Sequence, residues 1–259
     1  MTAISRKARP LGSSLGSGIV FAALVALWWA ASHAGWISRV FLPTPEATLD
    51  SLRAGLAAGG ELASFTLATT LRMLEGWLLA SLLGVALGAL IGISPTARAY
   101  LQPTLEFVRP LPASALMPLA IALLGLSPAM VLSVVAFGAM WPVLLATVHG
   151  FAAVDARLLE VARCLQLTQG EFVRTIGLPN ALPDILAGMR LSLTVSLIVS
   201  VVGEMIASQP GLGQAILLAA RAFHASELFA GIVLLGVIGF ASNTLLGYAE
   251  RALLKWQST

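Results

Sequence analysis

The sequence predicts an all-α protein that crosses a membrane about six times. Hydrophobic residues make up 58% of the 259 residues and charged residues only 10%, whereas soluble domains typically contain about 25% charged residues. The mean hydropathy of +0.91 is too high for a water-exposed surface. Apolar runs recur from Gly18 to the C-terminus, and no polar stretch between them is long enough to form a soluble core. We therefore expect one transmembrane domain at residues 18–259, preceded by a tail at residues 1–17.

Six apolar segments are candidate transmembrane helices, because a helix needs roughly 20 apolar residues to cross the hydrocarbon core. The third is short and surrounded by prolines, so we expect it to be broken or interfacial. A signal peptide is the alternative for the first, but its apolar run continues past the weak cleavage-like sequence Ser32-His33-Ala34. The predicted spans are Ile19–Ile37, Leu67–Ile93, Ala113–Leu126, Met130–Val148, Ile185–Ala207 and Leu228–Tyr248.

The basic residues predict the orientation of these spans, because Lys and Arg favour cytoplasmic loops. With the N-terminus in the cytoplasm, 11 of the 15 basic residues lie inside, including Arg98, Arg109 and those of the long segment 150–190. Both termini are then cytoplasmic. The four basic residues left for the outer side are Arg39, Arg53, Arg72 and Arg221.

Composition also excludes several classes of function. The net charge of +3 comes without a stripe of basic and aromatic residues, so nucleic acid is not an expected partner. Cys164 is the only cysteine, which excludes an intrachain disulfide and a cysteine-based metal site. ATP binding by a phosphate loop requires a glycine-rich turn that ends in lysine. Neither Lys7 nor Lys255 follows such a turn, so the chain is not expected to be an enzyme or to bind a cofactor itself.

A polar segment at about 150–184 interrupts the apolar runs on the predicted cytoplasmic side. Apolar residues recur in it at helical spacing from Val154 to Leu165, and charged residues occupy the other face. Thr168 and Glu171 form a capping-box pattern that predicts a second short helix. We expect Leu178-Pro179 to end this helix, and Pro183 and Asp184 to occupy the first turn of the next span. Such a pair of helices can bind a soluble partner or lie on the lipid headgroups.

Two predicted spans carry small residues at every fourth position, a pattern that lets helix backbones approach closely. The second span carries Gly76, Ala80, Gly84, Gly88 and Gly92, and the fifth carries Gly188, Ser192, Ser196 and Ser200. Helix packing and pore lining both fit this pattern, and helix packing is the interpretation that we favour. The candidates for a translocation path are Ser192, Ser196, Ser200, Glu204 and Arg221. Glu204 can pair with a basic neighbour or face an external partner, and Arg221 can attract an anion or anchor the membrane interface.

The polar segment resembles the EAA loop of the permeases of ATP-binding-cassette (ABC) importers. The similarity rests on Glu160-Val161-Ala162 and Ile176-Gly177-Leu178-Pro179 at the family spacing. Val161 replaces an alanine, and Gln166 replaces the glycine that normally permits the turn between the two helices. Further strings resemble the sulfonate, taurine and nitrate branch of this family, namely Phe41–Pro45, Thr70–Arg72, Val108–Pro112, Gly203–Met205 and Gly211–Gly213.

This resemblance implies a type I ABC-importer permease in a bacterial inner membrane, with the EAA loop docking on a cytosolic ATPase. The positions carried over to that role are Glu160, Val161, Ala162, Gln166, Ile176, Gly177, Leu178 and Pro179. It also implies two ATPase subunits that bind ATP and Mg, an external substrate-binding protein, a second permease copy and a small anionic substrate. Related permeases suggest a vitamin precursor or an aromatic acid as alternatives.

The principal rival is an ion-coupled secondary transporter, which would be expected to keep ionisable side chains inside the membrane. The middle of each predicted span other than the third is uncharged, which argues against this class. A membrane scaffold without transport is a third possibility, but it leaves the polar helical segment without a function.

Overall fold

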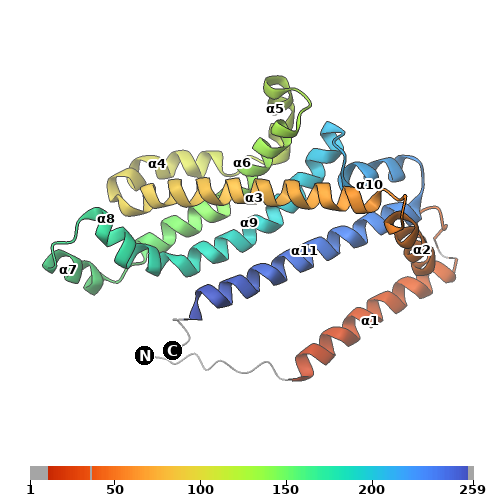
Figure 1. The fold of residues 1–259 in the computed structure, drawn as a ribbon, viewed down its shortest axis with the longest axis horizontal. Coiled ribbons are helices and arrows are strands. Elements are labelled where there is room, and N and C mark those ends of the chain that lie inside the picture. The colour runs from red at the N-terminus through yellow and green to blue at the C-terminus, as the bar shows by residue number, and fades with distance from the viewer. Residues whose placement is uncertain (1–10, 36, 256–259) are drawn as a thin grey trace. The chain divides into compact units, whose positions relative to one another are not determined.

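The computed structural model describes residues 11–35 and 37–255 of the chain, and Figure 1 shows their arrangement. Within these residues all regular structure is helical, which confirms the all-α prediction. The helices are α1 (Leu11–His33), α2 (Pro45–Leu56), α3 (Leu62–Ile93), α4 (Pro95–Val108), the 3₁₀ helix η1 (Ala113–Leu116), α5 (Met117–Leu124), α6 (Pro128–Ala152), α7 (Ala156–Cys164), α8 (Gln169–Phe172), the π-helix η2 (Val173–Gly177), α9 (Leu178–Ala207), α10 (Leu212–Arg221) and α11 (Ala225–Leu253).

Four predicted spans are confirmed as helices that are long and apolar enough to cross a membrane. They are α3, α6, α11 and the continuous helical segment Gln169–Ala207, which contains α9. The third predicted span, Ala113–Leu126, corresponds to η1 and α5, which meet the preceding α4 at an angle of 80°, so the expectation of a broken helix is confirmed. Pro110 and Pro112 lie in the connection, where their missing amide donors prevent a continuous helix.

The first predicted span corresponds to α1, whose ends differ from the prediction. The helix begins at Leu11, inside the predicted tail, and ends at His33, four residues before the predicted end at Ile37. Gly35 follows with a left-handed φ of 71°, a conformation in which glycine avoids the clash that a Cβ would make. Residues 1–10 of the predicted tail and Trp36 lie outside the described residues.

The described residues form two compact units, one of those up to residue 61 with 216–232 and one of residues 62–215 with those from 233 on. In the first unit, Trp28 fixes the connection between α1 and α2. Its Nε1 donates to the carbonyl of Pro43 at 3.0 Å, and its ring stacks on Phe229 with centroids 5.6 Å apart. Thr44 then caps α2 by accepting a hydrogen bond from the Ala47 amide at 3.2 Å. Arg221 belongs to this unit and is exposed at the end of α10.

The second unit is built around α3, α6 and α9, which lie side by side (Figure 1). The small residues of α3 contact α6 so closely that a Cβ on Gly88 would lie 2.6 Å from the Cβ of Thr147. On α9, a Cβ on Gly188 would lie 2.7 Å from the Cβ of Ala146. Both distances are too short for nonbonded carbon atoms, so only glycine allows these helices to approach as they do. The prediction that the small-residue stripes serve helix packing is confirmed.

Arg109 lies at the bend between α4 and η1, level with the middle of α6. The neighbouring Ala113 contacts α6 at Gly138, where an added Cβ would lie 2.7 Å from the Cβ of Ala113. Gly138 is in the central part of α6, far from both helix ends. Arg109 lines the same cavity as Gly138 and Trp141, so it lies beside α6 and not in a loop beyond its end. The reason is that α4 runs back along α3 before the bend and carries Arg109 with it (Figure 1).

Candidate functional site

The polar hairpin, defined here as residues 155–177, begins with α7. Asp155 caps this helix by accepting a hydrogen bond from the Arg157 amide at 2.8 Å. Ala162 is buried. The neighbouring apolar side chains Leu158, Val161 and Leu165 are 41%, 48% and 66% exposed. Because three large apolar side chains at helical spacing are exposed on a polar segment, α7 presents a surface suited to a protein partner.

Glu160 is also exposed on α7, on the face away from these apolar residues. No side chain or backbone group in the described residues forms a hydrogen bond or ion pair with its carboxylate. A charged group at the surface without an internal partner contributes little to the fold itself. Glu160 is therefore available for an external cation.

A sharp turn at Leu165–Leu167 ends α7. The Gln166 amide donates to the carbonyl of Arg163 at 3.0 Å, and the Leu167 amide donates to the carbonyl of Ala162 at 3.0 Å. These two bonds form a Schellman motif, in which the residue after the cap has left-handed backbone torsions. Gln166 has a φ of 51° as the motif requires. The turn therefore forms although glutamine replaces glycine.

Replacing Gln166 with Gly is expected to stabilise this turn by about 1 kcal/mol, since a side chain raises the energy of left-handed torsions by roughly that amount. Hydrogen–deuterium exchange at the Gln166 and Leu167 amides should slow about fivefold, because 1.4 kcal/mol corresponds to tenfold. Gln169→Gly is the matched control in a helical position, where glycine should accelerate local exchange. Faster exchange in both variants would contradict the proposed relief of strain.

The capping box predicted for α8 is confirmed. The Glu171 amide donates to Oγ1 of Thr168 at 3.4 Å, and Oε2 of Glu171 accepts from the Thr168 amide at 2.8 Å. The carboxylate also accepts from the Thr168 hydroxyl at 2.7 Å. Glu171 lies before the apolar part of the following helix. The start of the second helix is thus fixed by local side chains.

The prediction that Leu178-Pro179 ends this second helix is wrong. The chain continues through the π-helix η2 into α9, so Pro179 is the second residue of α9 and Pro183 lies inside the helix. In η2 the Leu178 amide bonds five residues back to the carbonyl of Val173, a wider turn that changes the hydrogen-bond register before the prolines. Leu178 remains 40% exposed and Ile176 is half-buried.

Two contacts attach this junction to α6. The Asn180 side chain donates to the carbonyl of Gly150 at 2.9 Å. Gly177 lies against Phe151, where an added Cβ would be 2.8 Å from the ring. The polar hairpin is thus joined to α9 by an unbroken helix that packs on its neighbour.

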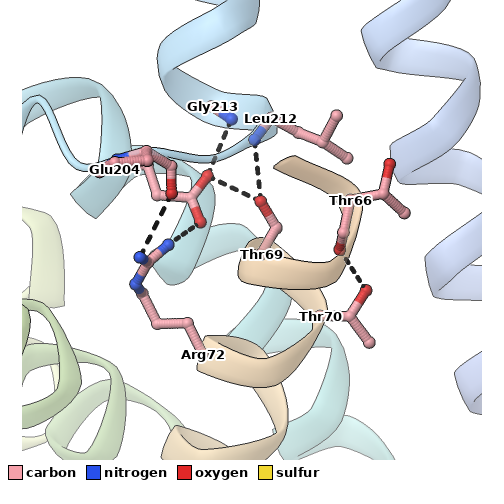
Figure 2. A network of polar contacts seen from close by, with 8 residues as sticks. Thr66, Thr69, Thr70, Arg72, Glu204, Leu212 and Gly213 are labelled. Carbon is pink, nitrogen blue, oxygen red and sulfur yellow. Dashed lines mark hydrogen bonds and ion pairs between the residues drawn. The ribbon is translucent and has the colours of Figure 1, made fainter. Parts of the chain in front are cut away.

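A second polar group lies at the opposite end of α9 and is shown in Figure 2. Glu204 is completely buried and forms an ion pair with Arg72 of α3. Its Oε2 also accepts from the Thr69 hydroxyl at 3.0 Å and from the Gly213 amide at 2.8 Å. The Leu212 amide in turn donates to the Thr69 hydroxyl at 2.9 Å. We call these five residues the Glu204 cluster.

The Glu204 cluster attaches the start of α10 to α3 and α9. Leu212 and Gly213 are the first residues of α10, and side chains from the two other helices satisfy their amides. Gly211 permits this contact, because a Cβ there would lie 2.4 Å from the Glu204 carboxyl carbon. Of the two alternatives from the sequence, pairing of Glu204 with a basic neighbour is the one observed. Thr69 as a partner was not predicted.

The serines proposed for a translocation path are inside the second unit. Ser192, Ser196 and Ser200 are all fully buried. The Ser196 hydroxyl donates to the carbonyl of Ser192 at 2.9 Å, which is a bond within α9. These side chains therefore lie within the helix packing described above and are closed to solvent.

Comparisons with known proteins agree with this architecture. Residues 80–255, more than half of the chain, match the family described as binding-protein-dependent transport system inner membrane component. The protein named as aliphatic sulfonates transport permease SsuC of Bacillus subtilis (strain 168) is 34% identical over 92% of this chain and 86% of its own length. The taurine transport system permease protein TauC of Escherichia coli (strain K12) is 29% identical over 91% and 87%.

Two more distant proteins are also similar to this chain. The bicarbonate transport system permease protein CmpB of Synechococcus elongatus is 26% identical over 73% of this chain and 69% of its own length. A chain in an inward-facing structure of the MetNI methionine ABC transporter has the same fold, with a TM-score of 0.63 over 75% of this chain and 94% of that chain, at 19% identity. The chain therefore belongs to the family of binding-protein-dependent transport system inner membrane components and is an ABC-transporter permease subunit.

Proposed function

We propose that this protein forms the membrane path of an ATP-driven importer for aliphatic sulfonates and related small organic anions. The substrate class is suggested by the names of the SsuC and TauC relatives. A homodimer of this chain completes the path, an external binding protein delivers the substrate, and two cytosolic ATPases bind ATP and Mg. Both termini and the polar hairpin face the cytoplasm, in keeping with the excess of basic residues assigned to that side.

The main observation behind this proposal is that α7 exposes apolar side chains and that the polar hairpin continues into α9 without a loop. Leu158, Val161 and Leu165 can insert into a groove of the ATPase, while Glu160 accepts charge-assisted hydrogen bonds from a cation at its rim. Ala162 and Gly177 contribute by packing inward, and Ile176, Leu178 and Pro179 form the junction with α9. Gln166 sets the direction of the turn.

The continuous helix from α8 to α9 supplies the mechanical link. When ATP brings the two ATPases together, each carries its bound hairpin with it. Because η2 joins the hairpin to α9 without a flexible loop, this displacement tilts α9 and the helices packed on it. Hydrolysis separates the ATPases and reverses the movement. Pro179 and Pro183 stiffen the junction, since proline fixes its own φ torsion.

Replacing Glu160 with Lys is expected to abolish stable binding of the ATPase, because a cation would then face a cation at a partly desolvated interface. The measurement is co-purification of the tagged permease with the ATPase encoded beside it, followed by ATPase activity in nanodiscs. We expect at least a tenfold loss of bound ATPase at unchanged permease yield.

Glu227→Lys is the matched control, since Glu227 is exposed at the start of α11, far along the chain from the hairpin. This variant should retain the ATPase. Equal co-purification of wild type and Glu160→Lys would reject the assignment of the hairpin. Uptake that proceeds without ATP but needs an ion gradient would instead identify a secondary transporter.

A further inference from the structure

A partly open cavity of about 310 Å³ lies in the second unit between the α4–η1 bend, α6 and α9. Its volume is at the lower end of the range for small-molecule sites. The α9 wall is apolar and includes Val195, Ile198 and Val202. The other walls carry three side chains with polar donors, namely Arg109, Ser114 and Trp141. We call it the Arg109 cavity.

Arg109 has no internal partner to neutralise it. Its guanidinium forms no hydrogen bond or ion pair with any residue in the described ranges 11–35 and 37–255. It is exposed and lies beside the central part of α6, a helix that is long and apolar enough to cross a membrane. An arginine within a membrane-spanning region usually marks a pathway for a substrate or an ion. An unpaired cation that lines a cavity favours an anion.

Trp141 supplies a second, independent indication. Its side chain is 93% buried, being 7% exposed, and its Nε1 has no acceptor among the described residues. Buried tryptophan N–H groups usually have a partner. The indole lies in the cavity wall and makes an edge-to-face contact with Phe137, with ring centroids 5.6 Å apart. An anion bound in the cavity would be a hydrogen-bond acceptor close to this N–H.

We propose that the Arg109 cavity is a transient binding site for an aliphatic sulfonate on its way through the permease. The planar guanidinium binds two sulfonate oxygens in parallel, and Trp141 and Ser114 donate to the sulfonate. The alkyl chain lies against Val195, Ile198 and Val202. This inference rests on the proposed transport of organic anions and adds the site and residues that select for them.

The charge of the cavity restricts the class of substrate that it can bind. The residues that line it include no aspartate or glutamate, so an ammonium group on the substrate would be desolvated without a counter-ion. The cavity therefore favours a simple alkanesulfonate over a zwitterion such as taurine. Discrimination at this site acts in addition to that of the binding protein.

The test uses the complete complex of permease and ATPase in nanodiscs, without binding protein, and measures equilibrium binding of radiolabelled butanesulfonate. We expect Arg109→Gln to weaken binding about 10- to 100-fold, as for loss of a charged hydrogen-bonding partner. Trp141→Phe keeps an aromatic ring and should weaken binding about 3- to 10-fold.

Taurine should compete with the radiolabelled butanesulfonate at least tenfold less well than unlabelled butanesulfonate does. Arg251→Gln, which changes an exposed arginine at the end of α11, is the control and should bind normally.

A second measurement separates the two proposals. ATP-dependent uptake of butanesulfonate is measured in proteoliposomes with binding protein added. If wild type imports butanesulfonate but binds none without the binding protein, or if Arg109→Gln binds as wild type does, the cavity assignment is rejected and the proposed function stands. Equal competition by taurine rejects the predicted selectivity. If wild type imports no sulfonate, the proposed function itself fails. Should the Arg109→Gln complex not assemble, Trp141→Phe decides the assignment by the same criterion.

Discussion

Glu204→Ala is expected to lower the free energy of unfolding of the second unit by about 3–5 kcal/mol, the usual cost of removing one partner from a buried ion pair. Arg72 would keep its charge in a site where its side chain is only 14% exposed. The Gly213 amide would lose its only side-chain acceptor, and Thr69 would lose the acceptor for its hydroxyl. Thermal unfolding of the detergent-solubilised protein, followed by intrinsic fluorescence, measures the loss.

Two companion variants test the cause of this loss. Glu75→Ala changes an exposed acid one turn along α3 from Arg72 and should alter stability by no more than about 0.5 kcal/mol. The double variant Glu204→Leu with Arg72→Leu removes both charges and should recover much of the stability, because no unpaired charge remains. A double variant as unstable as Glu204→Ala would show that the loss does not come from the unpaired arginine.

Gly88→Val is expected to destabilise the same unit by about 3 kcal/mol, at the upper end of the range for overpacked cores. A Cβ at this position would lie 2.6 Å from the Cβ of Thr147 and 2.7 Å from the carbonyl oxygen of Leu144. A backbone oxygen cannot rotate away as a side chain can, so α3 and α6 would have to separate. The measurement is again thermal unfolding, with retention of ATPase binding as a functional check.

Gly236→Ala is the control for this second substitution. Gly236 lies on α11 with no atom within 4 Å of an added Cβ. Alanine there should stabilise the helix by about 0.5–1 kcal/mol through its higher helix propensity. If Gly88→Val and Gly236→Ala both left stability unchanged, the close approach of α3 and α6 would not be required.

Helix α9 connects the three functional features described above. Its N-terminal end continues from the polar hairpin, its middle part forms the apolar wall of the Arg109 cavity, and Glu204 lies near its C-terminal end. In the proposed mechanism, a movement of the hairpin would be transmitted along this helix to the cavity and to the start of α10. Because Glu204 holds the C-terminal end of α9 to α3, the variants Glu204→Ala and Glu160→Lys test opposite ends of the helical segment that contains α9.

Local features of the sequence determined the class of the protein and much of its helical structure. The low content of charged residues and the lengths of the apolar runs are properties of composition, so four spans could be predicted without knowledge of packing. The capping box of Thr168 and Glu171 is equally local, because both residues belong to one turn. The small-residue stripe of α3 was correctly assigned to helix packing, since glycines at every fourth position share one face.

Only the tertiary structure decided the features that depend on residues far apart in the chain. Arg72 and Glu204 are 132 positions apart, so their pairing required α3 and α9 to be packed together. The helix continues through Pro179 because η2 and the contacts of Asn180 and Gly177 with α6 offset the missing hydrogen bond, against the local tendency of proline to end a helix. Arg109 lies beside the middle of α6 because α4 folds back along α3. No local sequence pattern specifies the direction in which α4 runs. In each case the deciding free energy comes from packing between helices, which the local sequence does not contain.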